Sequence, residues 1–200
     1  MRIGIVSDLH GNIEGLNLAL ERMGAVDEVF CAGDAFDQHR FSNEVVARLR
    51  EIGARYILGN HEEVLLGPQG VRAQERAYVD RDLLGWTRSQ PRMIRTRADG
   101  KTILMFHSTP WAPYGEYLYP HSRELAQLGS LDADFAIYGH THTRMALELD
   151  GTLVINPGSA GVTTDYGNGR RLSYAVLDTG SGEVSFDEFK AAPRGAPPAS

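Results

Sequence analysis

The sequence predicts an α/β domain whose first half builds a mostly parallel sheet and whose second half is rich in strands. Up to Leu58, short apolar runs alternate with amphipathic stretches of helical period, which is the pattern of right-handed strand–helix–strand crossovers. Beyond that point, strand-like runs come in pairs around Asp-Gly, a preferred turn of two-residue hairpins. The two patterns together favour one domain that contains both kinds of strand pairing.

The first half is expected to contain three strands and two helices. Three short apolar runs with polar ends have the form of buried strands: Arg2–Ser7, Val29–Ala32 and Ala54–Leu58. The stretch Ile13–Met23 places its apolar residues on one face of a helix. Ser42 is a typical N-cap residue, and the apolar stripe that follows it predicts a helix to about Ile52.

The second half is expected to contain one helix, Gln74–Leu84, followed by strands. The strand-like runs are Met93–Arg97, Thr102–His107, Phe135–Tyr138, Met145–Leu149, Thr152–Asn156, Ser173–Asp178 and Glu183–Phe189. Asp99-Gly100 and Asp150-Gly151 each separate two of these runs and predict hairpins. The Pro- and Ala-rich stretch Ala191–Ser200 is expected to be a flexible tail, which leaves residues 1–190 as a single domain.

Composition narrows the class of protein. The formal net charge of the 200 residues is −6, which argues against extended binding to a nucleic-acid backbone. A single cysteine, Cys31, excludes an intramolecular disulfide. No apolar run approaches the ~18 residues of a membrane helix, and the first run is too short for a signal sequence. We therefore expect a cytoplasmic protein that does not use a membrane as its partner.

Polar clusters follow five of the predicted strands, and five of the seven histidines lie in them. The clusters are Asp8-Leu9-His10, Gly33-Asp34, Gly59-Asn60-His61-Glu62, His107 and Gly139-His140-Thr141-His142. In open α/β sheets, ligands bind in the crevice beyond the carboxyl ends of the strands. Clusters at five strand ends are therefore expected to converge on one place.

These clusters have the composition of a metal site. Taken singly, an Asp after a strand is more often a helix N-cap and a histidine is more often a core or capping residue. Together they offer carboxylates, imidazoles and one amide oxygen without a thiolate, a donor set that suits Mn, Fe, Zn, Ni or Co. Seven such ligands exceed the needs of one ion with an open position. Two ions that share a carboxylate, ~3.5–4 Å apart, account for the number and could clamp a phosphoryl group.

Taken in order, the five clusters resemble the five motifs of the calcineurin-like metallophosphoesterases. The segment Asn156-Pro157-Gly158-Ser159 is also similar to one in the small bacterial and archaeal members, so the resemblance covers most of the chain. It implies a four-layer αββα sandwich, in which helices flank two mixed β-sheets. It also implies a dinuclear metal site at the carboxyl ends of the strands.

Carried over residue by residue, the resemblance implies two sets of metal ligands. One ion is expected to be bound by Asp8, His10, Asp34 and His142. The other is expected to be bound by Asp34, Asn60, His107 and His140, so that Asp34 bridges the ions. His61 matches the family's non-ligand histidine, which faces the substrate and protonates the leaving group. Asp37 falls where phosphatase relatives place an acid that orients this histidine, and a plain turn residue is an equal alternative.

Contacts to the substrate are less well defined by the sequence. Asn12, Arg40 and Arg144 adjoin the motifs and are expected to contact phosphate, with solvated loop residues as the alternative. Gln38 stands where phosphatase relatives have an arginine, which weakens a preference for dianionic monoesters. The aromatic segment Trp111–Tyr119 could stack a nucleobase, but we favour packing or a subunit contact.

The sequence therefore predicts a dinuclear metal-dependent phosphohydrolase in which a hydroxide that bridges the ions attacks phosphorus in line. A phosphodiesterase is preferred to a phosphomonoesterase or a nucleotide pyrophosphatase. The alternative from another class is a non-catalytic metal-binding scaffold, such as the small retromer subunit, which would have no chemical need for His61. We expect manganese in preference to iron, nickel, cobalt or zinc, and a small phosphoester or nucleotide as substrate. A homo-oligomer is left open.

Overall fold

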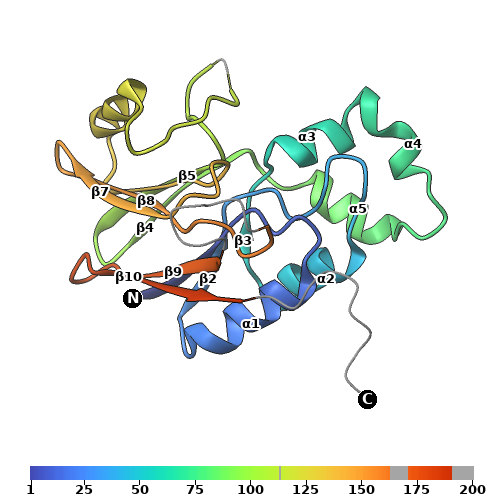
Figure 1. The fold of residues 1–200 in the computed structure, drawn as a ribbon, viewed down its shortest axis with the longest axis horizontal. Coiled ribbons are helices and arrows are strands. Elements are labelled where there is room, and N and C mark those ends of the chain that lie inside the picture. The colour runs from blue at the N-terminus through green and yellow to red at the C-terminus, as the bar shows by residue number, and fades with distance from the viewer. Residues whose placement is uncertain (113, 163–170, 191–200) are drawn as a thin grey trace.

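Two five-stranded sheets pack against each other, and the helices lie outside them (Figure 1). The structure is a computed structural model that describes residues 1–112, 114–162 and 171–190. The tail expected over residues 191–200 lies outside these described residues. In the view of Figure 1 the sheet that contains β5, β7 and β8 lies above the sheet that contains β2, β9 and β10. The predicted arrangement of two mixed sheets flanked by helices is confirmed.

The first sheet has the strand order β10-β9-β1-β2-β3. Its strands are β1 (Arg2–Val6), β2 (Glu28–Cys31), β3 (Arg55–Tyr56), β9 (Leu172–Asp178) and β10 (Val184–Phe189). β1, β2 and β3 are mutually parallel, as their crossovers predict, with Ile5 opposite Phe30 and Cys31 opposite Tyr56. β9 joins β1 antiparallel, and β10 joins β9 antiparallel, so the C-terminal part of the described chain completes the sheet begun by the N-terminus.

The second sheet has the strand order β4-β5-β6-β8-β7. Its strands are β4 (Met93–Ala98), β5 (Lys101–Phe106), β6 (Phe135–Ile137), β7 (Met145–Leu149) and β8 (Thr152–Asn156). The two predicted Asp-Gly hairpins, β4–β5 and β7–β8, are present and form its edges. Between them β5, β6 and β8 are parallel, so the two sheets have the same mixed design.

Alternation along the strands creates three apolar layers. In β1, Ile3 and Ile5 face the second sheet, whereas Val6 faces the helices. In β5, Ile103 and Met105 face the first sheet. Because successive strand side chains point to opposite faces, each sheet is buried on both sides. The two sheets therefore share one central core, which fixes the position of their strand ends relative to each other.

Helices cover the first sheet, and a 3₁₀ helix covers the second. The helical elements are α1 (Ile13–Met23), α2 (Asn43–Glu51), α3 (Asn60–Leu66), η1 (Pro68–Gly70), α4 (Val71–Gln74), α5 (Arg81–Arg88) and η2 (Arg123–Ser130). α1 coincides with its predicted range, and α2 begins after the predicted cap Ser42, whose side chain accepts from the Val45 N–H. In the described part of the chain, no helix is long and apolar enough to cross a membrane.

The helix predicted over Gln74–Leu84 is wrong. α4 ends at Gln74, residues 75–80 form a loop, and α5 begins at Arg81. Asp80 explains the break, because its carboxylate accepts hydrogen bonds from the N–H groups of Asp82 and Leu83 and so starts a new helix. The prediction treated Asp80 as a residue inside one helix and overlooked its role as an N-cap.

Candidate metal centre

The loops after five strands meet at one edge of the two sheets. β1 is followed by Asp8, and β2 by Asp34, and the Asp8 N–H donates to the Gly33 carbonyl at 3.0 Å. The Asp8 carboxylate then accepts from the His140 N–H, at 3.0 Å for its nearer oxygen, which ties the first sheet to the loop after β6. The parallel strands thus bring together residues that lie up to 132 positions apart in the sequence.

Three side chains from both sheets form the first ligand group: Asp8, His10 and His142. The Nε2 atoms of His10 and His142 lie 3.1 Å apart, and the His142 Nε2 lies 3.3 Å from Asp8 Oδ1. The Nδ1 of His10 lies 3.4 Å from Asp37 Oδ1, a carboxylate contact that orients the ring. Within the described residues, the buried Nδ1 of His142 has no hydrogen-bond partner. Donor atoms this close, and directed at one another, fit a cation between them.

The second ligand group lies beside the first: Asp34, His107 and His140. The His107 Nε2 lies 3.3 Å from Asp34 Oδ2 and 3.0 Å from Asn60 Oδ1. The other ring nitrogen of His107 lies 2.7 Å from the Ala32 carbonyl, which can only accept, so the proton sits on Nδ1 when the ring is neutral. The Nε2 lone pair of that tautomer points at the two oxygens, as a metal ligand requires.

His61 lies at the boundary between these groups. Its ring is 4.6 Å from the ring of His10, and its Nε2 is 3.9 Å from Asp34 Oδ2. His10, Asp34 and His61 therefore also have donor atoms close enough to hold an ion. The Nδ1 of His61 accepts from the Gln38 N–H at 3.1 Å, which places the proton of the neutral ring on Nε2. The geometry is compatible with a proton donor, and the role of His61 as a non-ligand stays a prediction.

The buried charges strongly favour cations at this edge. Burial alone would lower the pKa of His107, but the carboxylates of Asp34 and Asp8 outweigh it and raise this pKa to about 10. Burial would raise the pKa of Asp34, yet the neighbouring imidazoles of His107, His61 and His10 hold it below its usual range. Burial, followed by the charge of His107, lowers the pKa of His140 to about 4. Two buried carboxylates among imidazoles are the donors that divalent transition metals prefer.

The backbone at the site is unusual, because five of the predicted ligands have left-handed φ values between 46° and 67°: Asp8, His10, Asp34, His140 and His142. Glycines next to them leave no space for a side chain. A Cβ on Gly59 would overlap Asp34 Oδ1 and lie 2.7 Å from the Asp34 backbone nitrogen. A Cβ on Gly139 would overlap Ser7 Oγ and lie 2.7 Å from Asp8 Oδ2. The glycines of the motifs are therefore required by close approach of the loops.

Glu62 holds two of the loops together, a role that the sequence analysis missed. Its buried carboxylate accepts from the N–H groups of Asp34, Ala35 and Gly59 at 2.7–2.9 Å and from the Tyr56 hydroxyl at 2.7 Å. Burial, together with the charge of Asp34, raises the pKa of Glu62 to about 7, whereas the four donors favour its ionised form. The signal in the sequence is Glu62 itself, three residues after the N-cap Gly59 of α3.

The predicted substrate contacts fall into different environments. Asn12 caps α1 by accepting from the Gly15 N–H and donates to the Gly161 carbonyl, so its amide bonds to the backbone. Arg144 forms an ion pair with Glu188 of β10. Arg40 is exposed and follows Asp37 in a tight turn closed by the Arg40 N–H and the Asp37 carbonyl. Of the three, Arg40 has the geometry most suited to meeting a substrate.

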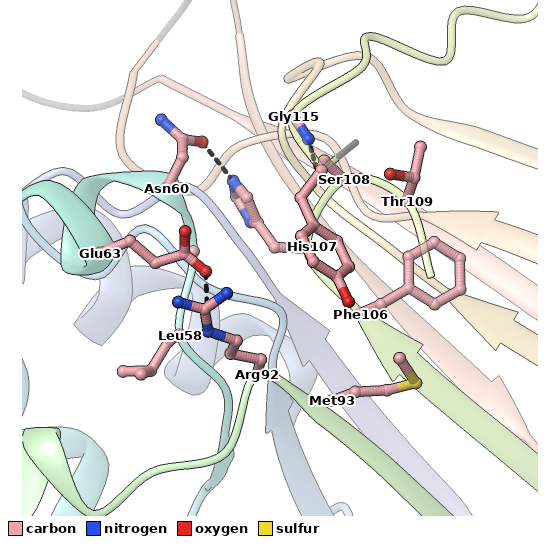
Figure 2. A pocket seen from close by; sticks show the side chains of 12 residues that line it. Leu58, Asn60, Glu63, Arg92, Met93, Phe106, His107, Ser108, Thr109 and Gly115 are labelled. Carbon is pink, nitrogen blue, oxygen red and sulfur yellow. Dashed lines mark hydrogen bonds and ion pairs between the residues drawn. The ribbon is translucent and has the colours of Figure 1, made fainter. Parts of the chain in front are cut away.

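Aromatic and charged side chains border the site beyond His140 and His107. The Tyr117 ring stacks on the His140 ring with their centroids 4.0 Å apart, so part of the predicted aromatic segment packs against a candidate ligand. Figure 2 shows a small cavity with the bonded pair Asn60 and His107 on one side and the Glu63–Arg92 ion pair on another. This cavity has a volume of about 100 Å³.

The fold and these clustered side chains define a class of protein. The family model of the calcineurin-like phosphoesterase superfamily domain matches residues 1–182, and the chain belongs to this superfamily. It is a metal-dependent phosphoester hydrolase.

Individual relatives agree with this family. The chain is 26% identical over 205 aligned positions to an uncharacterized protein of Methanocaldococcus jannaschii, MJ0912, covering 88% of this chain and 82% of that protein. It is similar to the crystal structure of a metallophosphoesterase from Sphaerobacter thermophilus, with a TM-score of 0.78 and 25% identity over 96% of this chain and 90% of the other. An archaeal phosphodiesterase gives a TM-score of 0.61 and 25% identity, covering 94% of this chain and all of that one.

Proposed function

We propose that the chain is a phosphodiesterase with a dinuclear metal centre. One ion is held by Asp8, His10, Asp34 and His142, and the other by Asp34, Asn60, His107 and His140. The observation that carries the proposal is that the donor atoms gather in adjacent, overlapping groups: Asp34 belongs to the second ligand group and also to a group with His10 and His61, and His10 in turn belongs to the first ligand group. The donor set can hold any of the transition metals considered above, and manganese is the one we expect. Residues 1–190 form one domain in this proposal, and its place of action is the cytoplasm.

Two kinds of side chain take part in the proposed reaction: ligands that hold the ions, and His61, which transfers a proton. When bound, the two ions would lower the pKa of a water molecule and neutralise the phosphoryl oxygens. The Asp34 carboxylate would hold both ions, and its negative charge would offset their repulsion. To act as the acid, His61 must be the imidazolium, which gives its Nε2 proton to the departing oxygen and becomes neutral. The Gln38 N–H contact to Nδ1 belongs to the neutral ring and is given up while both ring nitrogens carry protons. Asp37, which orients His10, also lies near enough to influence the charge of His61.

A diester is preferred because the described site has few cations to clamp a dianion. Gln38 replaces the arginine of the phosphatase pattern, and Arg144 is paired with Glu188. Arg40 is the remaining predicted guanidinium beside the site. A singly charged diester needs fewer cations to compensate its charge than a doubly charged monoester. The shortage of cations therefore weakens the binding of a diester less than that of a monoester. The related archaeal phosphodiesterase supports the same substrate class.

Asp34→Asn tests this function. An amide poorly offsets two adjacent dications, so the variant should lose metal and hydrolysis of bis(p-nitrophenyl) phosphate together. Asp132→Asn is the control, because Asp132 is fully exposed and forms an ion pair with Arg95. Elemental analysis and turnover are measured on both variants. Two retained ions with near-normal turnover would overturn the dinuclear assignment. Full metal loading of the unaltered chain without turnover of any phosphoester would favour the scaffold instead.

A further inference from the structure

A larger cavity opens beside the metal residues, on the side of the first ligand group. Its volume is about 500 Å³, within the range of small-molecule sites. His10 and Asp37 line both this cavity and the cleft that contains Asp34, His61 and His142, so the two spaces are direct neighbours. A substrate whose phosphate lies at the metal residues could therefore extend into this cavity.

Tyr78 forms an aromatic wall of the cavity. Its side chain is 50% exposed, although its neighbour Val79 is buried in the core and anchors the loop of residues 75–80. Asn43 at the start of α2 fixes this loop twice. Its amide donates to the Tyr78 carbonyl at 2.6 Å and accepts from the Asp80 N–H at 3.0 Å. These bonds fix the backbone of the loop that interrupts the predicted helix, and the exposed Tyr78 ring lines the cavity from it, where it can serve as a stacking platform.

Charge restricts what this cavity can accept. Three carboxylates line it, from Glu14, Asp37 and Glu44, against one guanidinium, that of Arg40. An excess of negative charge disfavours a further phosphate group, because like charges at such distances repel. The carboxylates can instead accept hydrogen bonds from the amino group of a base or the hydroxyls of a ribose. An aromatic wall with acidic acceptors fits an uncharged nucleoside better than a polyphosphate chain.

We propose that this cavity binds the nucleoside of a nucleotide phosphodiester, with the base stacked on Tyr78. The inference rests on the proposed phosphodiesterase function and names its substrate class. His61, the proton donor to the leaving group, lines the metal cleft and not this cavity. The nucleoside is therefore the group that stays on phosphorus, and the other ester oxygen departs on the His61 side.

Two substrates with the same leaving group test the proposal. Adenosine 5′-(p-nitrophenyl phosphate) and methyl p-nitrophenyl phosphate differ only in the group that stays on phosphorus. The wild type should prefer the adenosine ester in kcat/KM, and Tyr78→Ala should reduce this preference at least about fivefold, the lower end of what base stacking supplies. Tyr78→Phe keeps the ring and should keep the preference.

Tyr114→Ala is the matched control, because Tyr114 is a similarly exposed tyrosine that lines the cavity of Figure 2 on the other side of the site. It should leave the substrate preference unchanged. A wild type without preference, an unchanged preference in Tyr78→Ala, or a loss of preference in Tyr114→Ala would each overturn the proposal.

A binding measurement separates this inference from the proposed function. Saturation-transfer NMR with adenosine on the metal-free protein should show transfer to the adenine protons for the wild type and Tyr78→Phe, and a large loss for Tyr78→Ala. No transfer to the wild type overturns the nucleoside site whatever the enzyme hydrolyses. If neither ester is turned over with any metal while adenosine binds through Tyr78, the phosphodiesterase function fails and the nucleoside site stands.

Discussion

The hairpin turns and the metal site use the same backbone conformation for different ends. Among the described residues, seven non-glycine positions have positive φ: Asp99 and Asp150 in the two hairpins, and five of the proposed ligands. In the hairpins the left-handed residue is followed by a glycine with positive φ, the pattern of a tight two-residue turn. The turn residues are solvent-exposed, and a Cβ on Gly100 or Gly151 would meet nothing within 4 Å.

At the metal site the left-handed residues are crowded by neighbouring loops, and all of them except the partly buried His142 are buried. Gly59 and Gly139 have no room for a Cβ, and Glu62 binds the backbone of two loops at once. A strained conformation of this kind persists only where the surroundings enforce it, and such places are commonly functional. The comparison teaches that left-handed φ in the hairpins shapes a turn, whereas at the site it directs side chains toward one another.

The largest effect is expected at His61, which is helical and carries no left-handed φ. If the left-handed residues hold the metals and His61 does not, His61→Ala should retain both ions. Loss of a positioned general acid costs ~10²–10⁴ in rate, and the cost should be largest for an alkoxide leaving group and smaller for p-nitrophenolate. Metal content and turnover of both substrate types are measured. Loss of an ion, or equal slowing of all leaving groups, would mean that His61 is a ligand or an electrostatic stabiliser.

A pair of glycine substitutions tests the comparison directly. Gly59→Ala should displace Asp34 and weaken metal binding by about 10- to 100-fold, the range found when the groups that orient metal ligands are altered. Gly151→Ala faces open space at φ 90°, so it should cost roughly 1 kcal/mol of stability and leave metal binding intact. Metal titrations and thermal unfolding distinguish the two. Equal metal affinities in both variants would remove the claim that close packing shapes the site.

Glu62→Gln should weaken the loops without removing a ligand. One carboxylate oxygen becomes an NH₂ group, so at least one of the four donors around it loses its acceptor. The expected loss of stability is about 1–3 kcal/mol for each such donor. Tyr56→Phe, which removes one donor and leaves the carboxylate, is the milder control. Denaturant unfolding of both variants shows whether Glu62→Gln lowers the free energy of unfolding more than Tyr56→Phe does. An unchanged free energy of unfolding in Glu62→Gln would mean that Glu62 does not position the loops.

The smallest effect is expected in the pH dependence of the unfolding temperature of the metal-free protein, which should depend on the site and not on the hairpins. The pKa of His107 is raised from 6.5 to about 10, so its stabilisation is complete below pH 6.5 and declines as the pH rises toward 10. The pKa of His140 is lowered to about 4, so stability also declines as the pH falls from 6.5 to 4. The raised pKa of Glu62, about 7, adds a further decline from pH 4.5 to 7, so the unfolding temperature should be highest between about pH 4.5 and 6.5. His107→Gln should flatten the decline between pH 6.5 and 9, whereas Asp150→Asn should retain it.

Much of the fold follows from local patterns in the sequence. Both hairpins were predicted because Asp-Gly between alternating strands is a local signal. α3 was missed because Asn60, His61 and Glu62 form its first turn, and their polar side chains serve the site instead of continuing an apolar stripe. The loop at residues 75–80 was missed because Asp80 was treated as a residue inside a helix, whereas its carboxylate caps the start of α5.

The site was predictable in its residue types and not in its supporting contacts. Strand-end positions brought Asp8, Asp34 and His107 into one prediction, because parallel strands end at a common edge. The bonds from Glu62 to Asp34 and Gly59 arise from tertiary packing, which no local pattern encodes. The contact of Asp37 with His10 likewise depends on the turn of residues 37–40.

Anomalous X-ray diffraction from manganese-loaded crystals tests the central claim most directly, because it locates each ion independently of activity. The account predicts two peaks about 3.5–4 Å apart with an Asp34 oxygen at each, and His61 outside both coordination shells. A single peak, or an ion bound by His61 in place of the ligands after β6, would contradict it.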